Sequence, residues 1–202
     1  MKIKTHIHKL FLLMLVVFVS GCVTSNTAPR PNKPEVVRIE ILNLIPKDVE
    51  GFVYKGAKAY PDPWGYSMRY QLKRNRLVYS DVYVYPVPNT AAGIGSDAIA
   101  KRMAELALSE IDLAKEKGFY SEYEIIESRE FDLKGRPVSR SDLYLVKNNL
   151  ESFSLLFLTE SRGMLIKARM TMPDNEANRN SETWQRFVEE VFGVIIENID
   201  KA

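Results

Sequence analysis

Hydrophobic residues alternate with polar ones in short segments along most of the chain, which is the pattern of β-strands that turn one face toward a core. Val, Ile and Tyr are frequent in these segments, and Pro, Gly or Asn bounds them. Antiparallel hairpins are the natural connection between such neighbours. The predicted strands are 36–42, 51–60, 66–72, 77–87, 122–131, 137–146, 152–159 and 164–172.

Two other segments have the three- and four-residue hydrophobic spacing of helices. The first spans residues 98–117, with Ser96 or Asp97 as the expected N-cap and Gly118 directly after its last turn. The second is the clearest element of the chain, because its apolar side chains form one continuous face suited to a core. That face consists of Trp184, Phe187, Val188, Val191, Phe192, Ile195, Ile196 and Ile199.

Strand 77–87 carries apolar or aromatic residues on both of its faces. Val82 and Val84 alternate with Tyr83 and Tyr85. A strand of this kind needs cover on each side of its sheet, and helices on both faces would supply that cover. The sequence therefore predicts an α+β fold in which a largely antiparallel β-sheet is flanked by helices on both faces.

The order of strands, helix, strands and terminal helix, together with the segment Gly65–Tyr70 that opens an early strand, resembles the PsbP-like superfamily. The similarity covers residues 36–199 and implies a PsbP-like α/β/α sandwich. Members of this superfamily include a photosystem subunit, a Ran-release factor and many bacterial lipoproteins, so the resemblance implies an accessory or binding role. It assigns no site residue, because a shared fold does not by itself carry a function.

The N-terminal residues follow a different pattern. Residues 1–9 are basic, and residues 10–19 are apolar and lead into Ser20, Gly21 and Cys22. This layout is typical of a secretory signal, and its ending resembles the lipobox of bacterial lipoproteins. A permanent transmembrane helix is the alternative, but it needs roughly 20 apolar residues, whereas polar residues and three prolines follow soon after the cysteine.

The lipobox resemblance implies cleavage between Gly21 and Cys22 and attachment of a diacylglycerol to the Cys22 sulfur. Two or more acyl chains anchor a protein stably to a bilayer. We therefore expect acyl chains on Cys22 to hold the mature protein on a membrane. Val23 rather than Asp follows the cysteine, which in this family fits the outer membrane, on the periplasmic side, if the source has one.

Cleavage would divide the chain into a signal peptide, 1–21, a tether with three prolines, 22–35, and a single globular domain, 36–202. The signal contains three lysines and no acidic residue, so of 28 basic residues 25 remain against 26 acidic ones. A nucleic-acid partner is not expected, because it requires a concentrated positive face.

The same cleavage removes His6 and His8, the only two histidines of the chain. Ser-His-Asp and Cys-His catalysis is thereby excluded for the mature protein, and a His/Cys zinc site is excluded because the one cysteine is lipidated. No serine precedes a lysine by three positions, so the serine-lysine pattern of penicillin-binding proteins is absent as well. No catalytic residue, metal site or cofactor is predicted, and only carboxylate, lysine or tyrosine chemistry remains open.

The segment 60–66 is the strongest candidate for a contact surface. It places Tyr60, Trp64 and Tyr66 around a turn that contains two prolines. Tyr and Trp are common anchors of protein contacts, and a restrained turn lowers the ordering cost of binding. These three residues are the predicted partner-binding residues. The alternative is that the rings fold back onto the edge of the sheet.

Two loops have weaker signals for ligands. Residues 89–96 lead into a helix, as phosphate-binding loops do, but they lack the Gly-Lys-Ser/Thr ending, which favours an ordinary connection. Asp174, Glu176, Asn178 and Asn180 place oxygen atoms at alternate positions, as calcium loops do. The glycine and the bidentate glutamate of a calcium loop are missing, which favours a polar loop that caps the last helix.

Two charged segments also have a structural and a functional interpretation. Lys73–Arg76 concentrates three positive charges between two strands, where it could meet anionic headgroups, although a solvated hairpin tip is favoured. Glu122 and Glu124 share a strand face, and Glu127 is predicted to point to the opposite face, so no acid/base pair is expected there.

These observations favour a non-catalytic lipoprotein that holds a binding or scaffolding domain at the cell envelope. Its expected partner is another envelope protein, contacted through the 60–66 turn or a sheet edge. Two alternatives stay open: carriage of a small apolar ligand beneath the aromatic side of the sheet, and an enzyme that uses carboxylates or tyrosines.

Overall fold

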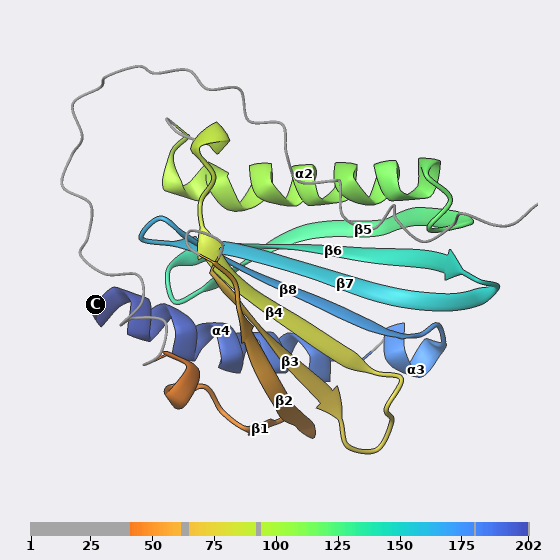
Figure 1. Ribbon diagram of the computed structural model, residues 1–202, viewed down its shortest axis with the longest axis horizontal. Coiled ribbons are helices and arrows are strands. Elements are labelled where there is room, and N and C mark those ends of the chain that lie inside the picture. The colour runs from red at the N-terminus through yellow and green to blue at the C-terminus, as the bar shows by residue number, and fades with distance from the viewer. Residues whose placement is uncertain (1–40, 62–64, 92–93, 180, 202) are drawn as a thin grey trace, which may run out of the picture. The chain divides into compact units, whose positions relative to one another are not determined.

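The alternating segments pair into one antiparallel sheet in the computed structural model, which describes residues 41–61, 65–91, 94–179 and 181–201. All of them belong to the compact unit Lys33–Ala202. Within this part of the chain the sheet has eight strands in the order β1-β2-β3-β4-β8-β7-β6-β5 (Figure 1). The strands are β1 (Asp48–Val49), β2 (Phe52–Ala59), β3 (Tyr66–Leu72), β4 (Tyr79–Pro86), β5 (Glu122–Leu133), β6 (Arg136–Lys147), β7 (Leu150–Ser161) and β8 (Met164–Pro173).

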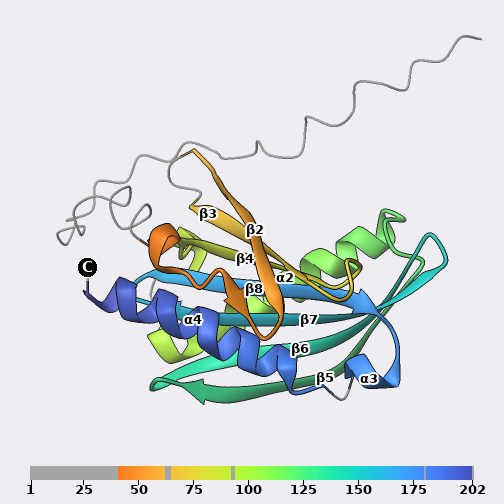
Figure 2. The ribbon, with the colours of Figure 1, turned by 90° about the horizontal axis from the view of Figure 1, so that it is seen from below.

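Helices lie on both sides of this sheet. Helix α2 (Ser96–Glu116) lies against β5, β6 and β7 on one side, and α4 (Thr183–Lys201) lies on the other, where Figure 2 shows it along the strands. The predicted α+β fold, an antiparallel sheet flanked by helices on both faces, is confirmed. Two further helices are short: η1 (Asn89–Ala91) and α3 (Glu176–Arg179).

The structure corrects two boundaries. The predicted strand 36–42 is not found: its residues 41 and 42 belong to a helical segment, 41–44, and its residues 36–40 lie outside the described part. The reason is that Ile41 and Ile45, four positions apart, both turn into the core at 2% exposure, and the Ile45 N–H donates to the Ile41 carbonyl at 3.1 Å. Helix α2 begins at Ser96, and its N-cap is Gly95 rather than Ser96 or Asp97.

The larger core lies between α4 and its face of the sheet. Phe187 of α4 is fully buried, with its ring centroid 4.7 Å from that of Phe52 and 5.1 Å from that of Tyr70. Tyr70 donates its hydroxyl to the Pro46 carbonyl at 3.0 Å, and burial raises the pKa of this hydroxyl well above its usual value. The helical periodicity of 184–199 is therefore confirmed as a core-facing surface.

A smaller core lies under α2. It joins apolar residues of the helix to those of β6, β7 and β8, so that the sheet is buried on both sides at its β6–β8 half. Its buried members are Ala91, Ile99, Met103, Ala104, Ile111, Leu143, Leu145, Leu156, Leu158 and Leu165.

Asp200 ties the end of α4 to the sheet. Its carboxylate accepts hydrogen bonds from Arg136 Nη2 at 2.8 Å and Ser161 Oγ at 2.9 Å. Partial burial acts to raise the pKa of Asp200, but these hydrogen bonds and the charges of Arg136 and Arg162 outweigh it, so the pKa lies below its usual value.

Because the folded-state pKa of Asp200 is lowered, its contribution to stability is present above its ordinary pKa and is lost as the pH falls through the folded value. We expect Asp200→Asn to lower the free energy of unfolding at pH 7 by about 1 kcal/mol or less, since the carboxylate is partly screened by solvent. Urea unfolding at pH 7 and at pH 3 measures this difference, which should shrink at the lower pH. A difference that grows toward low pH contradicts the assignment.

Candidate functional site

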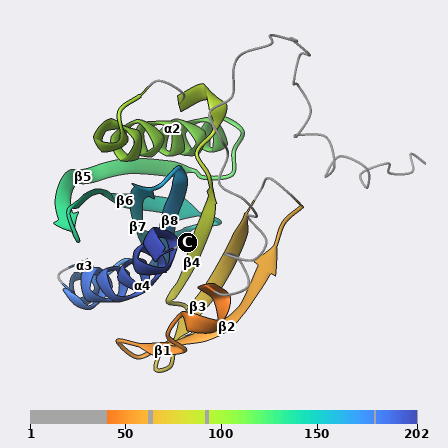
Figure 3. The same ribbon diagram turned by 90° about the vertical axis from the view of Figure 1, so that its left-hand side faces the viewer.

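Helix α2 leaves part of its side of the sheet uncovered. The helix lies over β5, β6 and β7, whereas β2 and β3 extend beyond it, as the end-on view in Figure 3 shows. We call this uncovered side of β2, β3 and β4, together with the bordering polar positions Lys167 and Arg169 of β8, the open face; Leu165 of β8 belongs to the core under α2. Its side chains come from alternate positions of each strand, and the intervening positions point into the α4 core.

The register places Arg69, Asp81 and Arg169 in one row across β3, β4 and β8. Arg69 binds Asp81 with both Nε and Nη2 at 2.7 Å, so this carboxylate is already engaged. Arg169 donates to the Tyr120 hydroxyl at 3.1 Å and to Ser154 Oγ at 3.4 Å, and among the described residues it forms no ion pair. This row therefore carries net positive charge.

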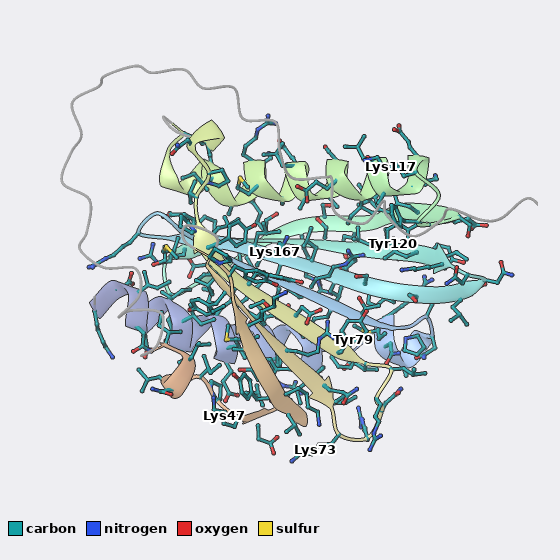
Figure 4. All side chains as sticks on the ribbon, viewed as in Figure 1. Lys47, Lys73, Tyr79, Lys117, Tyr120 and Lys167 are labelled. Atoms are coloured by element: carbon teal, nitrogen blue, oxygen red, sulfur yellow. The ribbon has the colours of Figure 1, made fainter. Side chains whose placement is uncertain are left out.

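The next row combines lysines with tyrosine rings. Lys58 Nζ lies 5.0 Å from the centroid of the Tyr60 ring, and the Tyr60 hydroxyl lies 3.2 Å from Ser67 Oγ. Lys167 Nζ lies 5.1 Å from the Tyr83 ring centroid. Both distances are within the range of cation–π attraction. Figure 4 labels Lys167 of β8, Tyr79 of β4 and Tyr120, which lies between α2 and β5.

Lys167 is held in a partly dehydrated place on this face. Burial lowers the pKa of its ammonium group, and the charge of Arg169 lowers it further, while Glu110 acts in the opposite direction. Its other aromatic neighbour is Tyr85, whose ring centroid lies 5.9 Å from Nζ. A cation in such a place gains from the approach of a negative charge, because little water screens the interaction.

A hollow of about 310 Å³ opens on the β2–β4 part of the open face. A bulge between Tyr54 and Gly56 bends β2 at this point, and Gly56 adopts φ +141°, which an L side chain rarely tolerates. Four of the lining side chains are charged, which suits an ionic or polar ligand better than the small apolar ligand considered from the sequence. The lining residues are Lys55, Gly56, Ala57, Lys58, Tyr60, Ser67, Arg69, Asp81 and Tyr83.

The tyrosines near this face are poor candidates for catalytic bases. Burial raises the pKa of Tyr83 and Tyr85, and it raises the pKa of Tyr123 to about 12. Efficient general bases have pKa values near the working pH. At neutral pH these hydroxyls are protonated and are suited to hydrogen bonding rather than to proton abstraction.

Two of the three predicted contact residues, Tyr60 and Tyr66, lie on opposite sides of the sheet. Tyr60 is half-buried on the open face, whereas Tyr66 is 3% exposed and belongs to the α4 core. The alternation of β3 explains this, since Tyr66 shares its face with Met68 and Tyr70. Trp64 and Cys22 lie outside the described residues.

Apart from Tyr60, the polar residues of the open face were missed in the sequence. Ser67, Arg69 and Gln71 occupy the polar positions of β3, and Lys167 and Arg169 those of β8. Polar side chains at alternate positions mark a solvated face, and this signal was available. The tyrosines of strand 77–87 instead led to the expectation of helical cover on both of its sides, whereas α2 covers mainly the neighbouring half of the sheet.

Glu127 lies on the same face as Glu124, contrary to the prediction. The register pairs Glu124 with Tyr144 and Glu127 with Asp142, because a bulge between Ile125 and Glu127 adds one residue and reverses the expected direction. Glu127 lies 3.4 Å from Arg129 in an exposed ion pair.

The calcium-like loop that begins at Asp174 is held by hydrogen bonds of its own residues. Arg179 binds Asp174 with two hydrogen bonds of 2.6 Å, and the Asn178 amide donates to the Pro173 carbonyl at 2.7 Å. The carboxylate oxygens of Asp174 are thus used within the calcium-like loop, whereas Asn180 lies outside the described residues. The described residues contain no group of three or more His, Cys, Asp and Glu that could hold a metal.

The segment Lys73–Arg76 forms the turn between β3 and β4, as the favoured interpretation predicts. Lys73 is paired with Asp48, and Asn75 Oδ1 accepts a hydrogen bond from the Leu77 N–H at 3.0 Å.

In the described part of the chain, no helix has the length and hydrophobicity needed to cross a bilayer.

Comparisons with known proteins give similarity of structure alone. No protein-family model matches the chain, and no curated protein sequence matches it. Among solved structures, cyanobacterial PsbP (CyanoP) from Synechocystis sp. PCC 6803 is 12% identical, with 70% of this chain and 85% of that chain covered and a TM-score of 0.49. A Pseudomonas aeruginosa protein of unknown function, described as a putative regulator, is 9% identical, with 68% and 94% covered and a TM-score of 0.45. The Saccharomyces cerevisiae Ran-binding protein Mog1p is 10% identical, with 74% and 82% covered and a TM-score of 0.40.

Proposed function

We propose that this chain is a lipid-anchored, non-catalytic binding module of the bacterial cell envelope that engages another envelope protein through the open face. The anchor rests on the lipobox-like ending at Cys22. The binding role rests on one observation: cationic and tyrosine side chains line a hollowed sheet surface that α2 does not cover.

The composition of the open face supports a protein partner. Tyr and Arg are enriched at protein interfaces, because both combine apolar contact area with a polar group that binds directionally. Tyr60, Tyr79 and Tyr83 hold such rings beside Lys58, Arg69 and Lys167, respectively. The cation–π contacts keep these side chains ordered before binding, which lowers the entropy lost on association.

The chemistry of the open face supports a non-catalytic role. Its carboxylate, Asp81, is bound by Arg69 through two hydrogen bonds of 2.7 Å. The half-buried tyrosine hydroxyls have raised pKa values. Neither group is in the state that proton abstraction at neutral pH requires.

The test is native mass spectrometry of the full-length protein extracted gently from its own membrane. We expect a lipid-sized mass increment at Cys22 and one stoichiometric protein partner. Tyr60→Ala and Tyr79→Ala should each weaken partner retention by about tenfold, as substitutions of interface tyrosines do. Tyr144→Ala, a half-buried tyrosine on the opposite side of the sheet, is the matched control and should retain the partner.

The outcomes separate the parts of the proposal. Equal partner retention by all three variants rejects the open face as the contact surface. A lipidated chain without any protein partner rejects the binding role, and an uncleaved, unmodified chain rejects the anchor.

A further inference from the structure

We propose that the outer edge of β2 accepts an extended acidic segment of the partner protein as an added β-strand, with the carboxylates of that segment directed into the hollow. This inference rests on the proposed function and specifies the chemistry of the partner. It depends on three features of the described residues: an unpaired strand edge, small side chains along that edge, and positive charge beside it.

Among the described residues, no strand pairs with the outer edge of β2 over most of its length. Strand β1 pairs only with Phe52 and Val53, and the last backbone contact on that side is the hydrogen bond from the Tyr54 N–H to the Lys47 carbonyl at 2.9 Å. No described strand lies beside residues 55–59 on that side. An unpaired edge is a ready template for an added strand.

The backbone hydrogen-bond donors on this edge can be identified. The Tyr60 N–H donates to the Gly65 carbonyl at 3.0 Å, toward the β3 side. Successive residues of an antiparallel strand direct their N–H groups to opposite edges. The N–H groups of Ala57 and Ala59 therefore point away from β3, toward the position of an added strand.

The side chains of this edge allow close approach of another backbone. Gly56, Ala57 and Ala59 are small, and a Cβ atom placed on Gly56 would meet no heavy atom within 4 Å. The other edge of the sheet, β5, differs in charge, because it carries exposed glutamates over much of its length. An acidic strand would be repelled there, which distinguishes the two edges.

The charge beside β2 selects an acidic strand. Lys55, Lys58 and Arg69 line the hollow against a single carboxylate, Asp81. Among the described residues neither lysine forms an ion pair. Side chains on one face of an extended strand repeat about every 7 Å, so alternate carboxylates of the added strand would face the open side. Gly56 of β2 pairs with Arg69 of β3 and has no side chain. A carboxylate of the added strand opposite Gly56 would therefore meet no side chain of β2 between itself and Arg69.

The experiment uses the full-length lipidated protein in discs of neutral phosphatidylcholine. Three fluorescent peptides of equal length are titrated and followed by anisotropy: one alternating Glu with Val, one alternating Lys with Val, and the Glu–Val peptide with every backbone amide methylated, so that neither of its edges can donate a hydrogen bond. We expect binding of the Glu–Val peptide, binding weaker by at least about tenfold for the Lys peptide, and a similar loss for the methylated peptide, because it cannot pair with a strand edge.

Two variants test the β2 side of the contact. Ala59→Pro removes one outward N–H while the β3 hydrogen bonds stay, and it should weaken the Glu–Val peptide by about fivefold, the effect of one backbone hydrogen bond. Lys58→Glu should weaken it by about tenfold. Lys101→Glu, the same charge change on the exposed side of α2, should leave binding unchanged. Thermal unfolding of each variant confirms that the fold is retained.

Several results would overturn the inference. Equal binding of the methylated peptide excludes strand addition. If phosphatidylglycerol vesicles displace the peptide, and if they bind the Lys58→Glu variant more weakly, the ligand is a lipid surface. If the protein associates with itself and Lys58→Glu abolishes this association, the ligand is a second copy of this chain. If the peptide fails to bind while Tyr60→Ala and Tyr79→Ala still lose the native partner, this inference fails and the proposed function stands. If both experiments fail, the proposed function fails too.

Discussion

Phe187→Ala is expected to lower the free energy of unfolding by about 3–5 kcal/mol, the cost of deleting a buried aromatic side chain and leaving a cavity. Phe187 is fully buried and joins α4 to the sheet through the rings of Phe52, at 4.7 Å, and Tyr70, at 5.1 Å. Close packing on both sides of the ring leaves the surroundings little room to collapse into the space. Urea denaturation monitored by circular dichroism measures the change, and the melting temperature should fall by roughly 10 °C or more.

The matched control is Phe119→Ala, which makes the same chemical change at a site that is 56% exposed. An exposed substitution of this kind changes stability by less than about 0.5 kcal/mol. Similar losses for the two variants would contradict the assignment of α4 and its sheet face as the main core. A loss confined to Phe187→Ala would support it.

Asp142→Ala is expected to have a comparable effect for an electrostatic reason. Arg140 and Asp142, two positions apart on β6, form a bidentate ion pair of 2.7 and 2.8 Å with side chains only 6% and 10% exposed. Removing the carboxylate leaves the Arg140 guanidinium buried without that carboxylate partner, with the Phe157 ring, whose centroid lies 5.5 Å away, as its cation–π neighbour. The expected loss is about 3–5 kcal/mol of unfolding free energy.

A double variant distinguishes the cost of an orphaned charge from the loss of a favourable pair. Arg140→Met with Asp142→Leu removes both charges and keeps apolar volume, so it should recover most of the stability lost in Asp142→Ala. Arg102→Ala breaks an exposed pair with Glu105 and should change stability by less than about 1 kcal/mol. A double variant that is less stable than Asp142→Ala would refute this account. Urea denaturation under the same buffer conditions measures all three.

The two sides of the sheet thus have separate roles in this account. The α4 side carries the large core and the buried ion pair, whose substitutions lower stability. The open face carries Tyr60, Tyr79 and Lys58, whose substitutions are expected to lower binding while the fold is retained. This separation makes the binding proposals testable without confusion with unfolding.

Local patterns were sufficient where one periodicity governs the environment of a whole element. The alternation of 66–72 predicted β3 with its observed bounds, and the apolar spacing of 184–199 predicted the buried side of α4. The predicted direction of Glu127 was wrong, because one extra residue interrupts the alternation of β5. The bulge after Ile125 moves Glu127 to the other face, and a bulge of this kind leaves no clear signal in residue type.

The candidate site was only partly predictable. Tyr60 lies on the open face as part of the expected contact surface, but Tyr66 is a core residue, because β3 begins at Tyr66 with its side chain toward α4. A turn sequence shows that aromatic residues are near one another along the chain. It does not show on which side of a sheet each ring lies.

The sequence by itself determined the type of most elements, although β1 was not predicted. It also determined the helical layers on both sides of an antiparallel sheet, and the removal of histidine chemistry if the signal is cleaved. These properties follow from the periodicity and composition of each segment, which do not depend on contacts with other segments. Only the tertiary structure decided where α2 lies, and hence which part of the sheet stays open. It also brought Arg69, Asp81 and Arg169 into one row. The reason is that strand order and register are set by contacts between segments distant in sequence, so no local pattern contains them.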